Sequence, residues 1–183
     1  MLCLREPGGT ALGERIRSIL LDPANQEMAA ECELLLMESS RAQLVRQVIE
    51  PALAEGAVVL CDRFFDSTYA YQHGGRGIAA DVVRTANALG SCGVVPDVTL
   101  VLDLPVDVAL ARATRGGADR LEAEGCAFQE RVRDAYRHLA EQEPCRVVTI
   151  NADAPADAVH ASVVSLLDAR VPALGLHVVR RGC

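Results

Sequence analysis

The chain has 183 residues, half of them apolar, and a formal net charge of −7. This length supports one hydrophobic core and is short for two, so we expect a single domain over 1–170 and a tail without clear pattern over 171–183. The negative charge, with no basic cluster, argues against nucleic acid as a partner. No stretch approaches the roughly 20 apolar residues of a membrane span, and the N-terminus lacks an export pattern, so we expect a cytoplasmic protein without a membrane partner.

Two residue types restrict the chemistry further. The seven cysteines are odd in number, widely spaced and never arranged as Cys-x-x-Cys, which argues against both a disulfide framework and a zinc site. All 18 basic residues are arginine. The chain therefore contains no lysine nucleophile, no Schiff-base lysine and no lysine of a phosphate-binding loop.

The first half of the chain predicts a strand, two helices and a second strand. Met1 to Leu4 is a short apolar run that enters a turn-rich loop, and apolar residues then recur at helical spacing over 11–21. A longer helical pattern covers 28–53, and Pro51 should kink or end it near Glu50. The continuous apolar run 57–61 indicates a strand buried on both faces.

The second half alternates strands and helices. After a Gly-rich turn that ends at Gly77, the expected elements are a helix over 78–89, a strand over 98–102, a helix from Pro105, an exposed segment over 112–120, a helix over 128–140, a strand over 146–150 and a helix over 155–169. Such alternation is typical of a doubly wound α/β domain, in which helices cover both faces of a parallel sheet.

The stretch VVLCDRFFDSTYAYQHGGRG, residues 58–77, holds the strongest functional signal. Its apolar strand stops at Asp62 and Arg63. Ligands bind beyond the carboxyl ends of strands in open α/β sheets, so these two side chains are candidates for a site. The alternative is a strand-end salt bridge with a helix cap at Ser67.

Arginines and aromatic residues gather near the same predicted edge of the sheet. Arginine suits phosphate because its planar group donates two parallel hydrogen bonds and stays charged. The candidates are Arg5, Arg17, Arg41 and Arg63. Any one of them alone is as well explained as a solvated surface charge. The aromatic side chains could wall a flat ring or belong to the core; they are Phe64, Phe65, Tyr69 and Tyr71.

The strings REPGGTALGERIR, SRAQLVRQVIEPALAEG, VVLCDRFFDSTYAYQHGGRG, PDVTLVLDLP and ARATRGGADRLEAE occur in this order over about residues 1–168. They resemble bacterial thymidylate kinase, and the DR-x-x-D-S-x-x-A-Y-Q element is distinctive. The resemblance implies the fold of a P-loop nucleoside monophosphate kinase, which transfers the γ-phosphoryl group of ATP to dTMP with Mg²⁺.

The resemblance also implies roles for individual residues. It places Arg41 and Arg63 at the monophosphate and thymine, Arg5 and Arg17 near the acceptor phosphate, and Thr68 and Gln72 around the nucleoside. Asp62 matches the acidic position associated with the metal and with catalysis. Arg115 and Arg120 fall in the lid, where an arginine stabilises charge on the transferring phosphoryl group. The positions beside the adenine are Asn151, Ala152 and Asp153.

The chain departs from the family pattern in two places. Met37 stands where the family usually has an aromatic residue that stacks on thymine, and methionine can also pack against a ring. More seriously, the family carries a first strand, a G-x-x-x-x-G-K-[ST] loop and a first helix before REPGG, and this sequence contains none of the three. We expect a misplaced or internal start, and little kinase activity from these 183 residues alone.

Three interpretations remain open at this point. The chain is an N-terminally shortened thymidylate kinase, a catalytically inactive remnant that binds dTMP or a partner, or a kinase for a different nucleotide. The helix over 28–50 has apolar residues on more than one side. That pattern fits a broad core-facing stripe, and the family resemblance favours a homodimer.

Overall fold

The computed structural model describes residues 1–113 and 120–171. Its elements in chain order are β1 (Leu2–Arg5), α1 (Ala11–Leu21), α2 (Ala30–Leu44), η1 (Val45–Ile49), α3 (Glu50–Ala54), β2 (Val59–Asp62), α4 (Phe65–Thr68), η2 (Tyr69–Gly75), α5 (Ala80–Gly90), β3 (Thr99–Asp103), α6 (Val106–Ala113), η4 (Glu122–Glu124), α7 (Cys126–Gln142), β4 (Val147–Asn151) and α8 (Ala156–Arg170).

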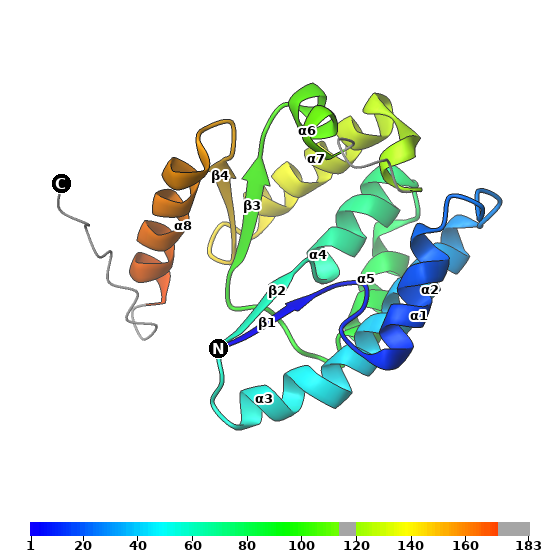
Figure 1. Cartoon of the computed structure of the whole chain (residues 1–183), viewed down its shortest axis with the longest axis horizontal. Coiled ribbons are helices and arrows are strands. Elements are labelled where there is room, and N and C mark those ends of the chain that lie inside the picture. Colours follow the sequence, from blue (N-terminus) through cyan, green and yellow to red (C-terminus); the bar gives the residue numbers. More distant parts are fainter. Residues whose placement is uncertain (114–119, 172–183) are drawn as a thin grey trace.

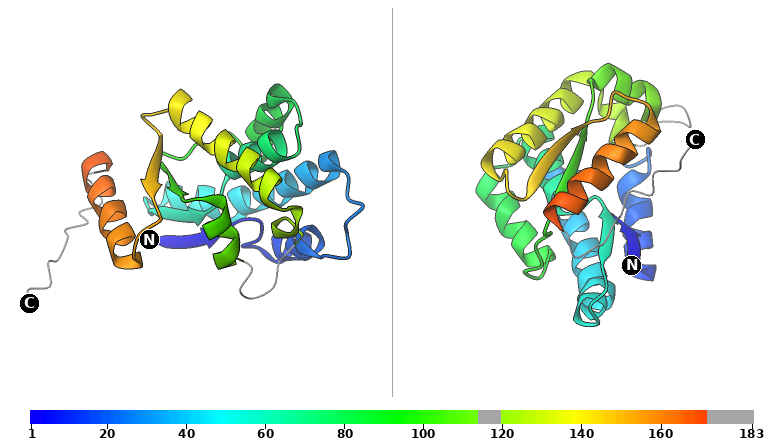
Figure 2. Two further views of the ribbon diagram at one scale, coloured as in Figure 1. Left: turned by 90° about the horizontal axis from the view of Figure 1, so that it is seen from above. Right: turned by 90° about the vertical axis from the view of Figure 1, so that its left-hand side faces the viewer.

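The strands are parallel, as the alternating pattern predicts, but they form two pairs rather than one sheet. β1 pairs with β2 in the register Leu2↔Val59, and β3 pairs with β4 in the register Thr99↔Val147. Within the described residues no ladder joins the two pairs. β2 and β3 are the inner strands and face each other (Figure 1), and the side view in Figure 2 shows the four strands in the order β4, β3, β2, β1. The predicted α/β architecture with parallel strands is confirmed, and in the described residues its strands are divided into two pairs.

The core lies in three clusters between the strands and the helices. The largest joins α2, η2, α5, α7 and β4 through Leu34, Tyr69, Val83, Leu139 and Val147. A second lies where α2 continues into η1, around Leu44, Val45 and Ile49. A third joins η2 to α7 through Ala70, Phe128 and Val132. η2 and α7 are thereby fixed to each other at the edge of the site.

The long helical pattern ends four residues later than Glu50, and the reason is local. α2, η1 and α3 are continuous, and the π-helical η1 immediately precedes Pro51. The amide of Glu50 donates to the carbonyl of Val45, five residues back. Proline has no amide hydrogen to donate. The wider π turn takes up the change at this point, so the helix continues to Ala54.

The Gly-rich stretch after β2 is helical rather than a turn. α4 and η2 run from Phe65 to Gly75 without a break. A β-carbon on Gly75 would lie 2.5 Å from two ring carbons of Phe128. The glycines there allow close approach to α7 instead of ending the helix, so the prediction of a turn is wrong up to Gly75.

The expectation that Arg120 lies in an exposed segment is wrong, because its side chain is only 5% exposed. Among the described residues, no helix combines the length and the apolar character needed to cross a membrane.

Candidate active site

The carboxyl ends of β1 and β2 open into a pocket at the start of α4. β2 ends at Asp62, whose carbonyl accepts a hydrogen bond from the amide of Glu6 at 2.9 Å. This bond holds the two strand ends together. Fourteen residues from six segments line the pocket: Glu6, Pro7, Arg17, Leu21, Met37, Arg41, Arg63, Phe64, Ser67, Thr68, Tyr71, Gln72, Leu121 and Glu122.

The pocket is small and is lined by both polar and apolar side chains. Its volume is about 90 Å³, below the roughly 300–1,000 Å³ typical of ligand sites. A larger ligand would therefore extend beyond it, or displace side chains at its mouth. Arg63 is exposed and is one of the side chains that could move in this way.

Arg41 is the most deeply buried cation of the site, with 2% of its side chain exposed. Its Nε donates to Glu6 Oε2 at 2.8 Å, and its NH1 donates to Glu38 Oε1 at 2.6 Å. NH2 donates to the hydroxyl of Thr68 at 2.8 Å, and NH1 also lies 3.3 Å from Asn87 Oδ1. Two carboxylates thus surround one guanidinium.

Burial also changes the pKa of the two carboxyl groups. Burial raises the pKa of Glu6 and of Glu38, and the charge and hydrogen bonds of Arg41 oppose the rise without cancelling it. Since both groups lie against the same cation, Arg41 brings little uncompensated positive charge to the pocket. It is better suited to a neutral polar ring than to a phosphate dianion.

Arg63 differs from Arg41 in both backbone and surroundings. Its φ of 67° lies in the left-handed region that side chains other than glycine rarely adopt. Strain of this kind gathers at functional sites. The guanidinium carbon lies 5.1 Å from the centre of the Tyr71 ring. Arg63 is exposed as a residue, and the partial desolvation of its guanidinium would lower its pKa; Tyr71, Tyr136 and Asp62 outweigh that effect and raise the pKa, so the side chain remains a cation.

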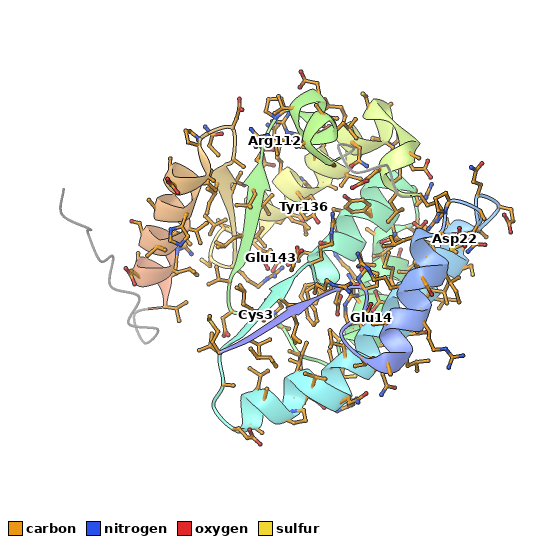
Figure 3. The ribbon with its side chains drawn as sticks, viewed as in Figure 1. Cys3, Glu14, Asp22, Arg112, Tyr136 and Glu143 are labelled. Carbon is orange, nitrogen blue, oxygen red and sulfur yellow. The ribbon has the colours of Figure 1, made fainter. Side chains whose placement is uncertain are left out.

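Tyr136 supports this end of the pocket from α7. It lies between α7 and α4 (Figure 3), and its hydroxyl donates to Ser67 Oγ at 2.7 Å. Burial raises its pKa to about 12, even though the positive charge of Arg63 acts in the opposite direction. The phenol is therefore neutral at physiological pH and acts as a hydrogen-bond donor.

The loop after β1 is held by its own contacts. Arg5 donates to both carboxylate oxygens of Glu14 at 3.2 and 3.0 Å, and Glu14 also accepts from the amide of Gly9 at 2.8 Å. Thr10 caps α1 by accepting from the amide of Gly13. Arg17 donates to the carbonyl of Pro7 at 3.0 Å. Glu14 lies at the start of α1 next to this loop (Figure 3).

The structure brings most of the sequence candidates together. Those that line the pocket are Arg17, Met37, Arg41, Arg63, Thr68 and Gln72. Phe64 and Tyr71 line it as well, while Tyr69 belongs to the core and Phe65 lies under Arg146. Arg5 and Asp62 lie at the adjoining strand ends but are not among the lining residues.

The remaining candidates lie elsewhere. Arg120 is buried: its Nε donates to the carbonyl of Leu20 at 2.8 Å, and its NH2 lies 2.5 Å from Glu33 Oε2 as an ion pair, without the geometry of a directional hydrogen bond. Arg115 lies outside the described residues. Asn151, Ala152 and Asp153 follow β4, where Ala152 lines a second pocket of about 510 Å³ with Leu102, Arg112 and His160.

Sequence reasoning missed Glu6, Ser67, Leu121 and Glu122 as lining residues, and Glu33, Glu38 and Asn87 behind them. Glu38 had a local signal, because it stands three residues before Arg41 on the same helix. Asn87 comes from α5, 46 residues further along the chain, and no local pattern connects it to Arg41.

Comparison with known proteins agrees with this geometry. The family model described as thymidylate kinase matches residues 1–163. A thymidylate kinase of Pseudomonas putida (strain GB-1) is 53% identical over 164 residues, 89% of this chain and 78% of the relative. One from Pseudomonas entomophila (strain L48) is 54% identical over the same shares of each chain.

A solved structure extends the similarity to three dimensions. The crystal structure of thymidylate kinase from Ehrlichia chaffeensis matches with a TM-score of 0.73 and 31% identity, covering 91% of this chain and 80% of that one. The family match, the identities and the shared fold together show that the chain belongs to the thymidylate kinase family and is, with it, a phosphotransferase of the nucleoside monophosphate kinase class.

Proposed function

We propose that the chain binds dTMP in the pocket between β1, α2 and α4. It would transfer the γ-phosphoryl group of ATP to the bound dTMP, with Mg²⁺, to give dTDP and ADP. The observation that carries this proposal is that two arginines in different states line the pocket. Arg41 is buried between Glu6 and Glu38, whereas Arg63 is exposed.

Arg41 and its buried neighbours suit the base. Arg41 is held by Glu6 and Glu38, so its charge is compensated, while Thr68 and Gln72 are almost completely buried beside it. Buried polar groups of this kind need partners, and the edge of a pyrimidine supplies both donors and acceptors. Phe64 and Tyr71 add aromatic surface to the same pocket.

Arg63, which is exposed, suits the monophosphate. Arg63 is a cation at the end of a strand, and its backbone is fixed by the strained turn. A planar guanidinium in such a place can donate two parallel hydrogen bonds to phosphate oxygens. Arg17 lines the same pocket, whereas Arg5 would first have to leave Glu14.

We place ATP on the other side of the strand ends. The second pocket, which Ala152 lines, would take the adenine, and Asn151 and Asp153 flank Ala152 in the chain. The part of the chain that the structure describes holds no cluster of three metal-ligating side chains. Mg²⁺ is commonly held by one or two carboxylates together with substrate phosphates and water, so Asp62 fits as a single protein ligand. Bound Mg²⁺ would neutralise charge on the phosphates.

The two lid arginines differ in their proposed roles. Arg115 would stabilise charge on the transferring phosphoryl group. The buried ion pair of Arg120 with Glu33 favours a structural role for Arg120, because a cation committed to a buried carboxylate is not available to a phosphate.

We also propose that a further parallel strand, followed by a phosphate-binding loop, fits between β2 and β3 and is supplied by a segment that this sequence does not contain. Two facts support it. The inner strands are unpaired toward each other, and each presents an exposed leucine, Leu60 at 55% and Leu102 at 52%. Unpaired edges next to exposed apolar side chains favour an added strand. An in-frame G-x-x-x-x-G-K-[ST] motif upstream of the Met1 codon supports this, and a stop codon there contradicts it.

A homodimer is a further part of the proposal. α1 and α2 pack against each other and expose Leu12, Ile19 and Leu35, the last at 63%. A second copy would cover these side chains. Sedimentation as a monomer at micromolar concentration contradicts a homodimer.

Thermal-shift titration with dTMP and with ATP, each alone, tests the proposed function. Stabilisation by dTMP that is lost in Arg63→Ala supports it, and no stabilisation by dTMP contradicts it. Because the sequence contains no phosphate-loop lysine, we expect turnover by these 183 residues alone to be at least about a hundredfold below that of the Pseudomonas putida relative. Ordinary turnover contradicts the proposed phosphate loop and leaves the dTMP site intact.

A further inference from the structure

Glu33 is a completely buried carboxylate that lies behind the pocket and does not line it. Donors from three residues meet at it. Gln72 Nε2 donates to Oε1 at 2.8 Å, and Arg76 donates from Nε to Oε1 at 3.1 Å and from NH2 to Oε2 at 2.9 Å. Arg120 NH2 lies 2.5 Å from Oε2. Of the described residues that contact Glu33 through these donors, Gln72 is the one that lines the pocket.

The charge state of Glu33 follows from these contacts. Burial by itself raises the pKa of the carboxyl, but hydrogen bonds from Arg76 and Gln72, together with the contact to Arg120, outweigh it and hold the pKa below its ordinary value. Glu33 is therefore ionised at neutral pH. An ionised carboxylate only accepts hydrogen bonds.

This property fixes the orientation of the Gln72 amide. A glutamine side chain has a donor end and an acceptor end of nearly the same shape, and its surroundings decide which way it turns. Because Glu33 can only accept, Nε2 of Gln72 must face it. Oε1 of Gln72 then faces away from Glu33, and it is buried without a hydrogen-bond partner.

An unpartnered buried acceptor on a pocket-lining side chain favours a ligand that donates. Leaving such an atom unsatisfied costs about 1–3 kcal/mol, so a ligand N–H that reaches it gains in affinity. We propose that Glu33 is a positioning residue, which turns Gln72 so that its Oε1 accepts a hydrogen bond from the N–H of a bound pyrimidine. This inference rests on the proposed function of the pocket.

The proposed contact separates two pyrimidines by their chemistry. N3 of thymine carries a hydrogen and donates, whereas N3 of neutral cytosine has none and only accepts. With Gln72 held by Glu33, two acceptors would face each other when dCMP binds. Glu33 therefore contributes to selection of dTMP over dCMP without touching either ligand.

Glu33→Gln tests the inference directly because it changes one atom of the carboxylate. Two arginine donors, from Arg76 and Arg120, lie at the Oε2 position and one, Arg76 Nε, lies at the Oε1 position, so the remaining oxygen of the new amide is favoured at Oε2. Its NH2 group then takes the Oε1 position and faces Gln72. Gln72 is expected to turn over and present Nε2 toward the pocket.

The measurement is the affinity of the 183-residue chain for dTMP and for dCMP by calorimetry, with displacement titrations where binding is weak. We expect Glu33→Gln to lower the ratio of dTMP affinity to dCMP affinity by on the order of tenfold or more. Arg76→Gln is the matched control, because it removes an ion pair of Glu33 and leaves the bond to Gln72 in place. We expect it to keep the ratio within about twofold of the unmodified chain.

The outcomes are distinguishable. A ratio that is unchanged in Glu33→Gln, or that falls equally in Arg76→Gln, overturns the positioning role while the dTMP site stands. If the unmodified chain binds no dTMP, the proposed function falls, and this inference falls with it. Should Glu33→Gln fail to fold, Gln72→Met decides, since it removes the acceptor and leaves both arginine contacts of Glu33. It should weaken dTMP at least about tenfold and change dCMP less than twofold, and equal losses for both overturn the inference.

Discussion

Replacing Arg41 with methionine should destabilise the fold strongly. Arg41 is 2% exposed, and it lies 2.7 Å from a carboxylate oxygen of Glu6 and 2.6 Å from one of Glu38. Methionine fills a similar length of side chain but leaves two buried carboxylates without a cation. Removing one partner of a buried ion pair typically costs about 3–5 kcal/mol, and we expect the free energy of unfolding to fall by that amount.

The assay is equilibrium denaturation with urea at pH 7.5, with Glu38→Gln and the double variant measured alongside. Because Glu38→Gln removes one of the two uncompensated charges, the double variant should be more stable than Arg41→Met alone. A loss below about 1 kcal/mol for Arg41→Met, or no recovery in the double variant, refutes the reasoning.

The pH dependence gives a second check on the same variant. Burial already raises the pKa of Glu6 and Glu38 in the folded chain, and loss of Arg41 should raise both further. A carboxyl group whose pKa is higher in the folded state takes up a proton on folding, so its destabilising effect is present above that pKa and disappears below it. The deficit of Arg41→Met should therefore shrink as the pH falls from 8 to 5, and a constant deficit contradicts it.

Three other variants test separate parts of the structure. Arg63→Lys should weaken dTMP at least about tenfold by calorimetry, because an ammonium group cannot reproduce a bidentate contact, and a change within twofold would assign Arg63 a structural salt bridge. Hydrogen bonds from Arg133 hold the pKa of Asp103 below its ordinary value of 3.8. In urea titrations the difference in free energy of unfolding between the unmodified chain and Asp103→Asn should therefore be largest above pH 3.8 and decline as the pH falls below it. A difference that grows at lower pH would contradict this. Gly75→Ala should cost about 1–3 kcal/mol in denaturation experiments, because the new methyl group would lie 2.5 Å from the Phe128 ring, and an unchanged midpoint would show that the helices can separate freely.

The sequence predicted the position of this pocket because strand ends carry a local signal. An apolar run that stops at a charged pair identifies the carboxyl end of a buried strand. The parallel pairing of β1 with β2 then brings the residues after Arg5 and after Asp62 together. The arginine types and the DR-x-x-D-S-x-x-A-Y-Q element were sufficient to locate most of the lining residues.

Whether each arginine is exposed or buried against a carboxylate could not be predicted in the same way, because its burial depends on contacts between distant segments. Arg41 and Arg120 both suggested available cations, yet each is buried against a glutamate, Arg41 at 2% and Arg120 at 5% exposure. Their partners include Glu6, which is 35 residues before Arg41. Helical periodicity carries no information about pairs at such separations.

Packing also overrode local propensity after β2. Gly74 and Gly75 are typical of a turn, but both meet α7 so closely that any β-carbon would clash, with Ala135 in one case and Phe128 in the other. Glycine is required there by the approach of two helices. A sequence pattern shows the glycines and cannot show which helix lies against them.

Titration of the unmodified chain and of Arg63→Ala with dTMP by isothermal calorimetry tests the central claim most directly. The account predicts saturable binding of one dTMP per chain and at least about tenfold weaker binding by the variant, with the free energy of unfolding changed by less than about 1 kcal/mol because Arg63 is exposed. No saturable binding at millimolar dTMP, or equal affinity in both proteins, would contradict the assignment of this pocket as the acceptor site.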